Sequence, residues 1–304
     1  MNELSNYFHI LNPSARHRAA VKRFFKNIPA DHYCWVERKS HPTHLETIVE
    51  WAVREKKGPI AVWAGDGSFN RVVNELFSRG VLPETLVALI PVGTANDFAR
   101  KMGWHCWTKW AKTLFSNEAG GKLFDLGLLS AGQQKRIFVN NAGFGRNPSK
   151  LGKGLSNPLK DILDFREHKI QVEWKTGHAE HFETLRAFFG IVFNAPFFNN
   201  GMYFDSDIAP DDGMLNGFLV PPQSKIRLLW RLVGSRFGKS LNDPQTFRMD
   251  ADSLEIDSDS EMFPQVDGEK VLHHAVNKLK FEVLKGKLKL ALPSENNANE
   301  QTIP

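Results

Sequence analysis

The stretch VWAGDGSFNRVVNEL, residues 62–76, places one aspartate between two glycines. Apolar residues at 59–64 predict a buried strand before it, and residues 68–80 have the spacing of an amphipathic helix. Glycine lets a ligand approach the backbone, and a helix start presents free N–H groups that suit a phosphate. Asp66 is therefore either an ordinary turn residue or a carboxylate that holds Mg²⁺ or polarises an attacking hydroxyl.

The residues around this stretch repeat the same alternation of strand and helix. Such alternation predicts a mostly parallel sheet with helices on both faces, and ligands of such sheets bind beyond the carboxyl ends of the strands. The loops 64–68 and 91–97 fall at those ends. We expect strands at 7–11, 32–40, 59–64 and 86–93, and helices at 15–27, 44–58 and 68–80.

The pattern changes after residue 122. Most of residues 123–293 read as strands, and the clearest helical patterns lie around 158–166 and 224–238. The sequence therefore predicts an α/β domain at 1–122, Rossmann-like with a mostly parallel sheet, a β-sandwich domain at 123–293 and a polar tail at 294–304.

Composition narrows the class of protein. Lys and Arg outnumber Asp and Glu by 39 to 34, an excess that suits an anionic ligand or membrane surface but that solubility explains equally well. The two cysteines, Cys34 and Cys106, lie far apart without CxxC spacing, which argues against a disulfide scaffold or a zinc site and fits a reducing compartment. Neither a secretory signal nor a spanning segment is evident, so we expect a cytoplasmic protein that is soluble or peripheral to the membrane.

The second loop, PVGTANDFARK at 91–101, follows a strand in the same way. Gly93 permits close backbone approach, Thr94 offers a hydroxyl, and Asn96 or Asp97 could cap the next helix. Taken alone, this loop predicts a capped helix more readily than a nucleotide site.

Together, GDGSFNRVVNEL and PVGTANDFAR resemble the catalytic domain of diacylglycerol kinases, a superfamily that includes sphingosine and ceramide kinases and the bacterial YegS-like lipid kinases. Further motifs follow in the order of that family, and the resemblance spans roughly residues 7–292. These motifs are LNP, FDLGLL, FVNNAGFG, MYFDSDIAPDDGMLNGFLV and FPQVDGE.

The resemblance implies transfer of the γ-phosphate of ATP to a lipid hydroxyl, in a cleft between a nucleotide-binding α/β domain and a β-sandwich. It implies ATP and Mg²⁺ as cofactors, a lipid substrate at the membrane surface and no nucleic-acid partner. The residues that it assigns to ATP are Ser40, Ala64, Gly65, Asp66, Gly67, Ser68, Asn70, Gly93, Thr94 and Asn96.

The resemblance also implies catalytic and metal-binding carboxylates. Asp267 of VDGE matches the family's proton acceptor, and Asp66 is the second candidate, directly or through Mg²⁺. Asp212 and the carbonyl of Leu215 match a structural Mg²⁺ site, but its further carboxylate is replaced at Asn216. Without the resemblance, both motifs read as ordinary turns between strands.

Two rival functions stay open at this point. NAD kinases share a GDG loop and an α/β-plus-β-sandwich plan, so a NAD kinase-like small-molecule kinase is one. The other is a nucleotide- or lipid-binding protein with weakened catalysis, because Ala64 replaces the first glycine of the usual GGDGT-type loop and a metal-binding carboxylate is missing at Asn216. The segment KIRLLWRLVGSRFGK, 225–239, is either an interfacial helix or a helix packed on the sandwich.

Overall fold

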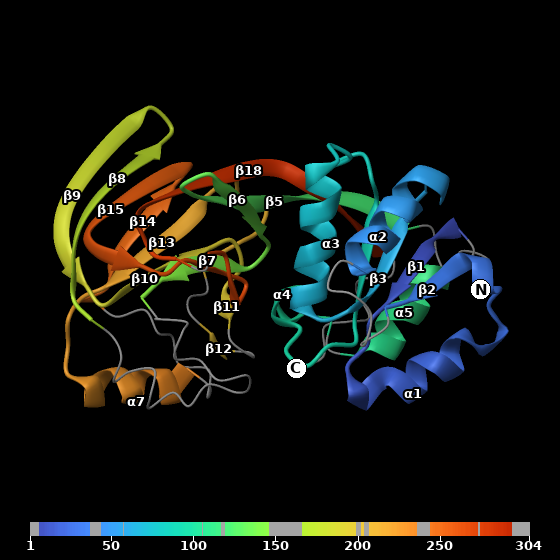
Figure 1. The fold of residues 1–304 in the computed structure, drawn as a ribbon. Helices are drawn as coiled ribbons and strands as arrows, with labels where there is room; N and C mark the ends of the chain where they lie inside the picture. The colour runs from blue at the N-terminus through green and yellow to red at the C-terminus, as the bar shows by residue number, and fades with distance from the viewer. Residues whose placement is uncertain are drawn as a thin grey trace. The chain divides into compact units, whose positions relative to one another are not determined.

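The computed structural model describes residues 6–36, 44–56, 58–104, 106–116, 119–145, 166–198, 202–203, 207–235, 244–272 and 274–293. The chain forms two compact units, one of Met1–Phe124 with Gly286–Pro304 and one of Asp125–Lys285. Figure 1 shows the elements of both. Strands β5 (Ala119–Ala131) and β18 (Val276–Pro293) have residues in each unit.

The first unit is built on a parallel sheet with the strand order β2-β1-β3-β4-β18. Every residue of β1, β3 and β4 is buried, which is why these strands read as unbroken apolar runs in the sequence. The bounds are β1 (Phe8–Leu11), β2 (Tyr33–Trp35), β3 (Ile60–Ala64) and β4 (Val87–Pro91).

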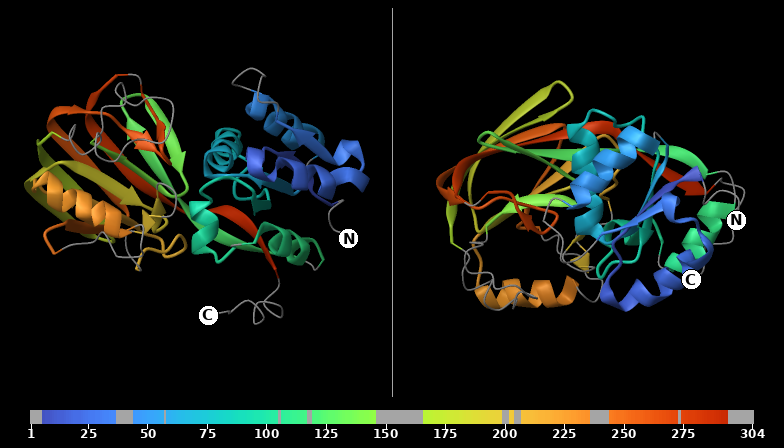
Figure 2. Two further views of the ribbon diagram at one scale, coloured as in Figure 1. Left: turned by 90° about the horizontal axis from the view of Figure 1, so that it is seen from below. Right: turned by 45° about the vertical axis from the view of Figure 1, so that its right-hand side comes forward.

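Helices cover both faces of this sheet, as the two views of Figure 2 show. On one face, the ring of His9 contacts those of Phe25 and Phe115 at centroid distances of 5.2 and 5.5 Å. On the other face, Phe8 contacts Trp51 at 5.1 Å. The helices are α1 (Ala15–Phe24), η2 (Phe25–Asn27), η3 (Ala30–His32), α2 (His44–Trp51), η4 (Ala52–Lys56), α3 (Asp66–Ser78), α4 (Asp97–Lys101) and α5 (Trp107–Ser116).

The second unit consists mainly of antiparallel strands in two sheets. One sheet has the order β18-β15-β8-β9, with β5 paired to β18 and β6 paired to β5; the other has the order β14-β13-β10-β7-β16-β17. The bounds are β6 (Gln134–Phe138), β7 (Asn141–Phe144), β8 (His168–Thr176), β9 (Ala179–Ala187), β10 (Phe189–Phe193), β11 (Phe197–Phe198), β12 (Met202–Tyr203), β13 (Leu215–Val220), α7 (Lys225–Ser235), β14 (Phe247–Ala251), β15 (Ser253–Met262), β16 (Gln265–Val266) and β17 (Glu269–Lys270).

The core of the second unit lies between its two sheets. Ile256 of β15 and Phe281 of β18 belong to one buried cluster with Val192 of β10 and Leu219 of β13. Because each strand alternates its side chains, one side of each sheet can supply this shared core. The expected fold class, a mostly parallel α/β domain followed by a β-sandwich, is confirmed.

The position of Ser40, the polar tail at 294–304 and all but the last residue of the helix expected around 158–166 lie outside the described residues. The helix expected at 224–238 is present as α7. No helix in the described part of the chain is long and apolar enough to cross a membrane.

Candidate functional site

The two glycine-containing loops of the first unit touch each other through their backbones. A Cβ atom built on Gly65 would lie 2.9 Å from the Cα atom of Gly93, and one built on Gly93 would lie 2.7 Å from the nitrogen of Gly65. Such contacts leave no room for a side chain at either position. Since these loops follow β3 and β4, the sheet topology brings them to one edge, as the sequence predicts.

Helix α3 begins at this edge. Gly65 is its N-cap residue and supplies no side chain, so no side-chain oxygen from that position occupies the N–H groups of the first turn. The hydroxyl of Ser68 accepts a hydrogen bond of 2.8 Å from the Nδ2 of Asn12, which follows β1. Such a helix start suits an anion, and the hydroxyl of Ser68 beside it is held by a residue that follows the neighbouring strand.

Asp66 has a defined structural task. Its Oδ2 accepts the backbone N–H of Asp97 at 2.9 Å and its Oδ1 accepts that of Phe98 at 3.1 Å. The carboxylate therefore caps α4 from a distant loop, and the helix terminus stabilises its charge. The sequence predicts a cap from Asn96 or Asp97, but the side chain of Asn96, the N-cap residue, makes no capping hydrogen bond.

Asn96 organises its own loop instead. It adopts a left-handed conformation with φ of +55°, and its Oδ1 accepts the N–H of Gly93 at 3.0 Å. Its Nδ2 donates to the carbonyl oxygens of Pro91 and Gly93, both at 3.3 Å. Asn tolerates this backbone conformation better than most residues, so Asn96 shapes the turn while Thr94 is left exposed beside it.

Ala64 and Asn70 lie beneath the loop surface. Ala64 ends β3 and is fully buried, so its methyl group is not exposed at the surface of the loop. Asn70 is buried on α3, and its Oδ1 accepts a hydrogen bond of 2.9 Å from Asn74. Gly67 is the remaining residue of the loop, half-buried in the first turn of α3.

In the second unit, Asp267 stands in a tight hairpin between β16 and β17. Asp267 and Gly268 both have positive φ angles, +45° and +82°, as the two central residues of a type I′ turn require. The Asp267 carboxylate accepts the backbone N–H groups of Val139, Asn140 and Asn141, each at 2.9 Å. This aspartate holds the segment between β6 and β7 in place.

Two further residues, Asp125 of the motif FDLGLL and Asn194 after the strand at 189–193, extend this network, and the sequence alone predicted no role for either. The Nδ2 of Asn194, fully buried, donates to the carbonyl oxygens of Asp125 at 3.0 Å and Val139 at 2.9 Å. The Oδ2 of Asp125 accepts the N–H of Gly213 at 2.6 Å. Asp125 of FDLGLL and Asn194 of the apolar segment GIVFNAP were the available signal, but their partners are distant backbone groups.

The turn at 210–215 does not fit a metal ion well. Asp212 accepts the N–H of Met214 at 2.9 Å, and burial, together with the charges of Asp125 and Asp211, raises the pKa of its carboxyl group. A Cβ built on Gly213 would lie 3.5 Å from the Nζ of Lys285, so an ammonium group already stands at this turn.

Lys285 also pairs with Asp252 at 2.6 Å, and this bond, with the nearby charges of Asp125 and Asp212, raises the pKa of the lysine. The described residues contain no group of three or more His, Cys, Asp or Glu side chains arranged to hold a metal. The carbonyl of Leu215 belongs to β13, which pairs with β14. Lys285 thus supplies at this turn the positive charge that a structural metal would supply.

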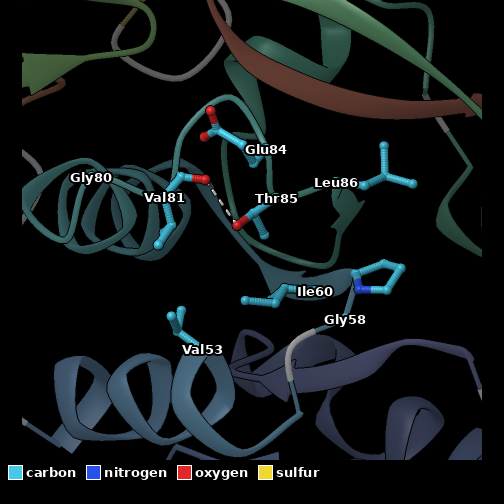
Figure 3. A pocket seen from close by; sticks show the side chains of 9 residues that line it. Val53, Gly58, Ile60, Gly80, Val81, Glu84, Thr85 and Leu86 are labelled. Atoms are coloured by element: carbon cyan, nitrogen blue, oxygen red, sulfur yellow. Dashed lines mark hydrogen bonds between the residues drawn. The ribbon is translucent and has the colours of Figure 1, made fainter.

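A pocket of about 450 Å³ lies at the opposite edge of the first unit's sheet (Figure 3). Its lining includes Ile60 and Leu86, at the amino ends of β3 and β4, and Val53. The Thr85 hydroxyl there donates to the carbonyl of Val81 at 3.0 Å. Since this pocket lies at the amino ends of the strands, it is separate from the loops at their carboxyl ends.

Comparisons with known proteins agree with this geometry. Residues 6–123 match the family model of the diacylglycerol kinase catalytic domain, and residues 139–292 match that of the YegS C-terminal NAD kinase beta sandwich-like domain. A protein of Pseudomonas aeruginosa UCBPP-PA14 named "Probable lipid kinase YegS-like" is 28% identical over 260 residues, covering 81% of this chain and 80% of that protein. YtlR of Bacillus subtilis 168 is 24% identical over 271 residues, covering 78% of this chain and 84% of YtlR.

The same fold occurs in solved structures. The crystal structure of a diacylglycerol kinase from Bacillus anthracis Sterne has a TM-score of 0.67 and 20% identity, covering 94% of this chain and 96% of that one. The two family models together account for most of the chain, and both structural units have the folds those models describe. This chain therefore belongs to the YegS-like, diacylglycerol kinase-related family of lipid kinases.

Proposed function

We propose that this protein transfers the γ-phosphate of ATP to the hydroxyl group of a diacylglycerol-like lipid. The observation that carries the proposal is the contact between Gly65 and Gly93, which joins the two loops beside the start of α3. Backbone N–H groups at a helix start suit the phosphate chain, and membership of the lipid kinase family supports a lipid acceptor. The acceptor's place in a bilayer implies peripheral action at the inner, cytoplasmic membrane surface.

The loop residues have different tasks in this proposal. Gly65, Gly67 and the Ser68 hydroxyl face the phosphates, while Asn96 keeps the second loop in shape and Thr94 contacts the nucleotide. Asp66 is a fitting Mg²⁺ ligand, because Mg²⁺ in kinases is held by one or two carboxylates together with substrate phosphates. When bound, Mg²⁺ would neutralise charge on the phosphates. Ser40 and Asn70 stay assigned to the nucleotide by the family resemblance.

Asp267 is the proposed proton acceptor. As the lipid oxygen forms its bond to the γ-phosphorus, the bond from that phosphorus to the bridging oxygen of ADP breaks, and the hydroxyl proton passes to the carboxylate. Three backbone N–H groups donate to this carboxylate, so the side chain of Asp267 is held in one orientation.

The rival with weakened catalysis rests on Ala64 and on the missing metal carboxylate at Asn216. The full burial of Ala64 argues against the first ground, and the turnover measurement decides between the rival and this proposal. No observed contact favours a NAD acceptor over a lipid, so NAD serves as a comparison substrate in the test.

The test is turnover of γ-labelled ATP by the full chain with diacylglycerol, phosphatidylglycerol, a sphingoid base or NAD as acceptor. We expect labelled lipid from the wild type and a loss of at least about 100-fold with Asp66→Asn, because the phosphate site and the α4 cap are both disturbed. Glu84→Gln, at the opposite edge of the same sheet, is the matched control and should keep its activity. Label on NAD alone, or on no acceptor, would contradict the proposal.

A further inference from the structure

The two most exposed large apolar side chains of the described residues stand on one helix. Ile226 and Trp230 of α7 are each 71% exposed to solvent. They are four residues apart, so they lie one above the other on the same face. Exposed apolar side chains that adjoin on a stable helix mark a contact surface more clearly than scattered ones do.

The opposite face of α7 attaches the helix to its own unit. Leu228 is only 2% exposed, and at about 100° per residue it lies about 180° around the helix from the middle of the Ile226–Trp230 pair. Arg231 donates to the Oε1 of Gln223 at 3.3 Å and to the hydroxyl of Thr246 at 3.1 Å. The apolar pair is therefore outward-facing because the helix is held from behind, and Figure 1 shows α7 outside the sheets of the second unit.

The start of the helix is also secured. The Ser224 hydroxyl accepts the N–H of Arg227 at 3.3 Å, and the Ser224 carbonyl accepts that of Leu228 at 3.1 Å. This N-terminal cap fixes the first turn, which carries Ile226. A fixed turn presents its side chains with little loss of conformational freedom on binding.

The charged residues of α7 all have one sign. The helix contains Lys225, Arg227 and Arg231 and no Asp or Glu, and Lys225 and Arg227 flank Ile226 in the chain. At helical spacing, those two basic residues lie on either side of the apolar pair. A tryptophan and an isoleucine between basic residues have the chemistry of an interfacial helix on an anionic bilayer.

We propose that α7 docks this protein on an anionic phospholipid surface, with Ile226 and Trp230 entering the headgroup region. The partner is a bilayer because the pair combines apolar insertion with cationic flanks, and a lipid acceptor resides in such a surface. This inference rests on the proposed function only for that last point, since membrane binding requires neither ATP nor turnover.

The test is cosedimentation of the full chain with vesicles of phosphatidylcholine, with and without phosphatidylglycerol, in the absence of ATP. We expect binding to the anionic vesicles that weakens as salt is added. Trp230→Ser should lower the partition coefficient by about tenfold and Ile226→Ser by several-fold, because each removes most of one inserted side chain. Phe182→Ser, which changes a 57% exposed side chain on β9, is the matched control and should bind like the wild type.

Equal binding by Trp230→Ser and the wild type would overturn the proposal, as would equal wild-type binding to both kinds of vesicle or to neither. A wild-type dimer that Trp230→Ser converts to a monomer would also overturn it, because a second copy would then cover the apolar pair. Circular dichroism of each variant identifies loss of fold. Vesicle binding without any lipid phosphorylation would contradict the proposed function alone and leave this inference standing.

Discussion

At the scale of single residues, the carboxylates of both candidate catalytic aspartates accept hydrogen bonds from backbone N–H groups. Asp66 receives two backbone N–H groups and Asp267 receives three, in each case from a distant segment. A carboxylate can accept about four hydrogen bonds, so these contacts occupy much of its capacity and fix its orientation. Substitution of either residue therefore affects folding as well as chemistry.

Asp267→Asn shows this coupling most clearly. The amide NH₂ must replace one carboxylate oxygen, and it then faces a backbone N–H donor at Val139 or at Asn140 and Asn141. We expect the free energy of unfolding to fall by about 1–3 kcal/mol, together with a large loss of turnover. Urea unfolding checks the first effect and labelled-ATP turnover the second.

The control for that variant is Glu269→Gln, which changes an exposed carboxylate in the same hairpin. It should unfold like the wild type. Sequence reasoning alone favours an Asp267→Asn protein that loses turnover and keeps its fold. Wild-type stability of Asp267→Asn would show that the three hydrogen bonds contribute little.

At the scale of secondary-structure elements, the site depends on loops that touch. Gly93→Ala places a methyl group where the nitrogen of Gly65 and the Oδ1 of Asn96 would each be 2.7 Å away. Since both neighbours are held, the loops must separate, and we expect a loss of roughly 1–3 kcal/mol of stability with a raised KM for ATP. Thermal unfolding and steady-state kinetics measure these effects.

Gly120→Ala is the matched control for that prediction. A Cβ atom at Gly120 would have no heavy atom within 4 Å, outside its chain neighbours. This variant should have the melting temperature and the KM for ATP of the wild type. A Gly93→Ala protein with an unchanged KM would show that the loop contact does not position the nucleotide.

The ammonium group of Lys285 beside the 210–215 turn leads to a second prediction at this scale. Because Lys285 lies beside Gly213 and pairs with Asp252, we expect EDTA to leave the melting temperature of the nucleotide-free wild type unchanged. Lys285→Met removes the ammonium group from near Asp125 and Asp212 and should melt at a lower temperature.

Added Mg²⁺ should raise the melting temperature of Lys285→Met more than that of the wild type, because it can replace the missing positive charge. Lys278→Met, which removes a lysine paired with Glu255 at 2.7 Å on the same strand, provides the comparison. A wild-type protein that EDTA destabilises would instead indicate a bound structural metal.

At the scale of the whole molecule, we expect the pH dependence of stability to involve His168, a buried residue of β8 that faces β15. His168 is buried, its Nδ1 lies 2.8 Å from the Ser260 hydroxyl and 3.3 Å from that of Ser258, and Phe144 packs against its ring. Burial lowers the pKa of His168 below its ordinary value of 6.5, although the charge of Asp259 opposes this shift. The folded protein thus favours the neutral ring.

The sign of the pH effect follows from that shift. Below about pH 6.5 the unfolded chain binds a proton at this position that the folded chain resists, so the stabilisation present above pH 6.5 is lost as the pH falls toward the lower, folded pKa. Between about pH 7.5 and 5, we expect the melting temperature of the wild type to fall further than that of His168→Gln. If the melting temperatures of the two proteins fell equally with pH, His168 would be excluded as the source of the pH dependence.

The sequence by itself determined the order of strands and helices from β1 to β4 and the two loops that follow β3 and β4. Apolar runs, glycine turns and helical spacing are local patterns, so they are readable without neighbours, and the same is true of the DG hairpin at 267–268. The tertiary structure alone decided what these side chains bind. Asp66 caps a helix 31 residues later, and Asp267 holds a backbone N–H 128 residues earlier. Every residue except proline carries such an N–H, so residue identity cannot reveal which distant one an aspartate will reach.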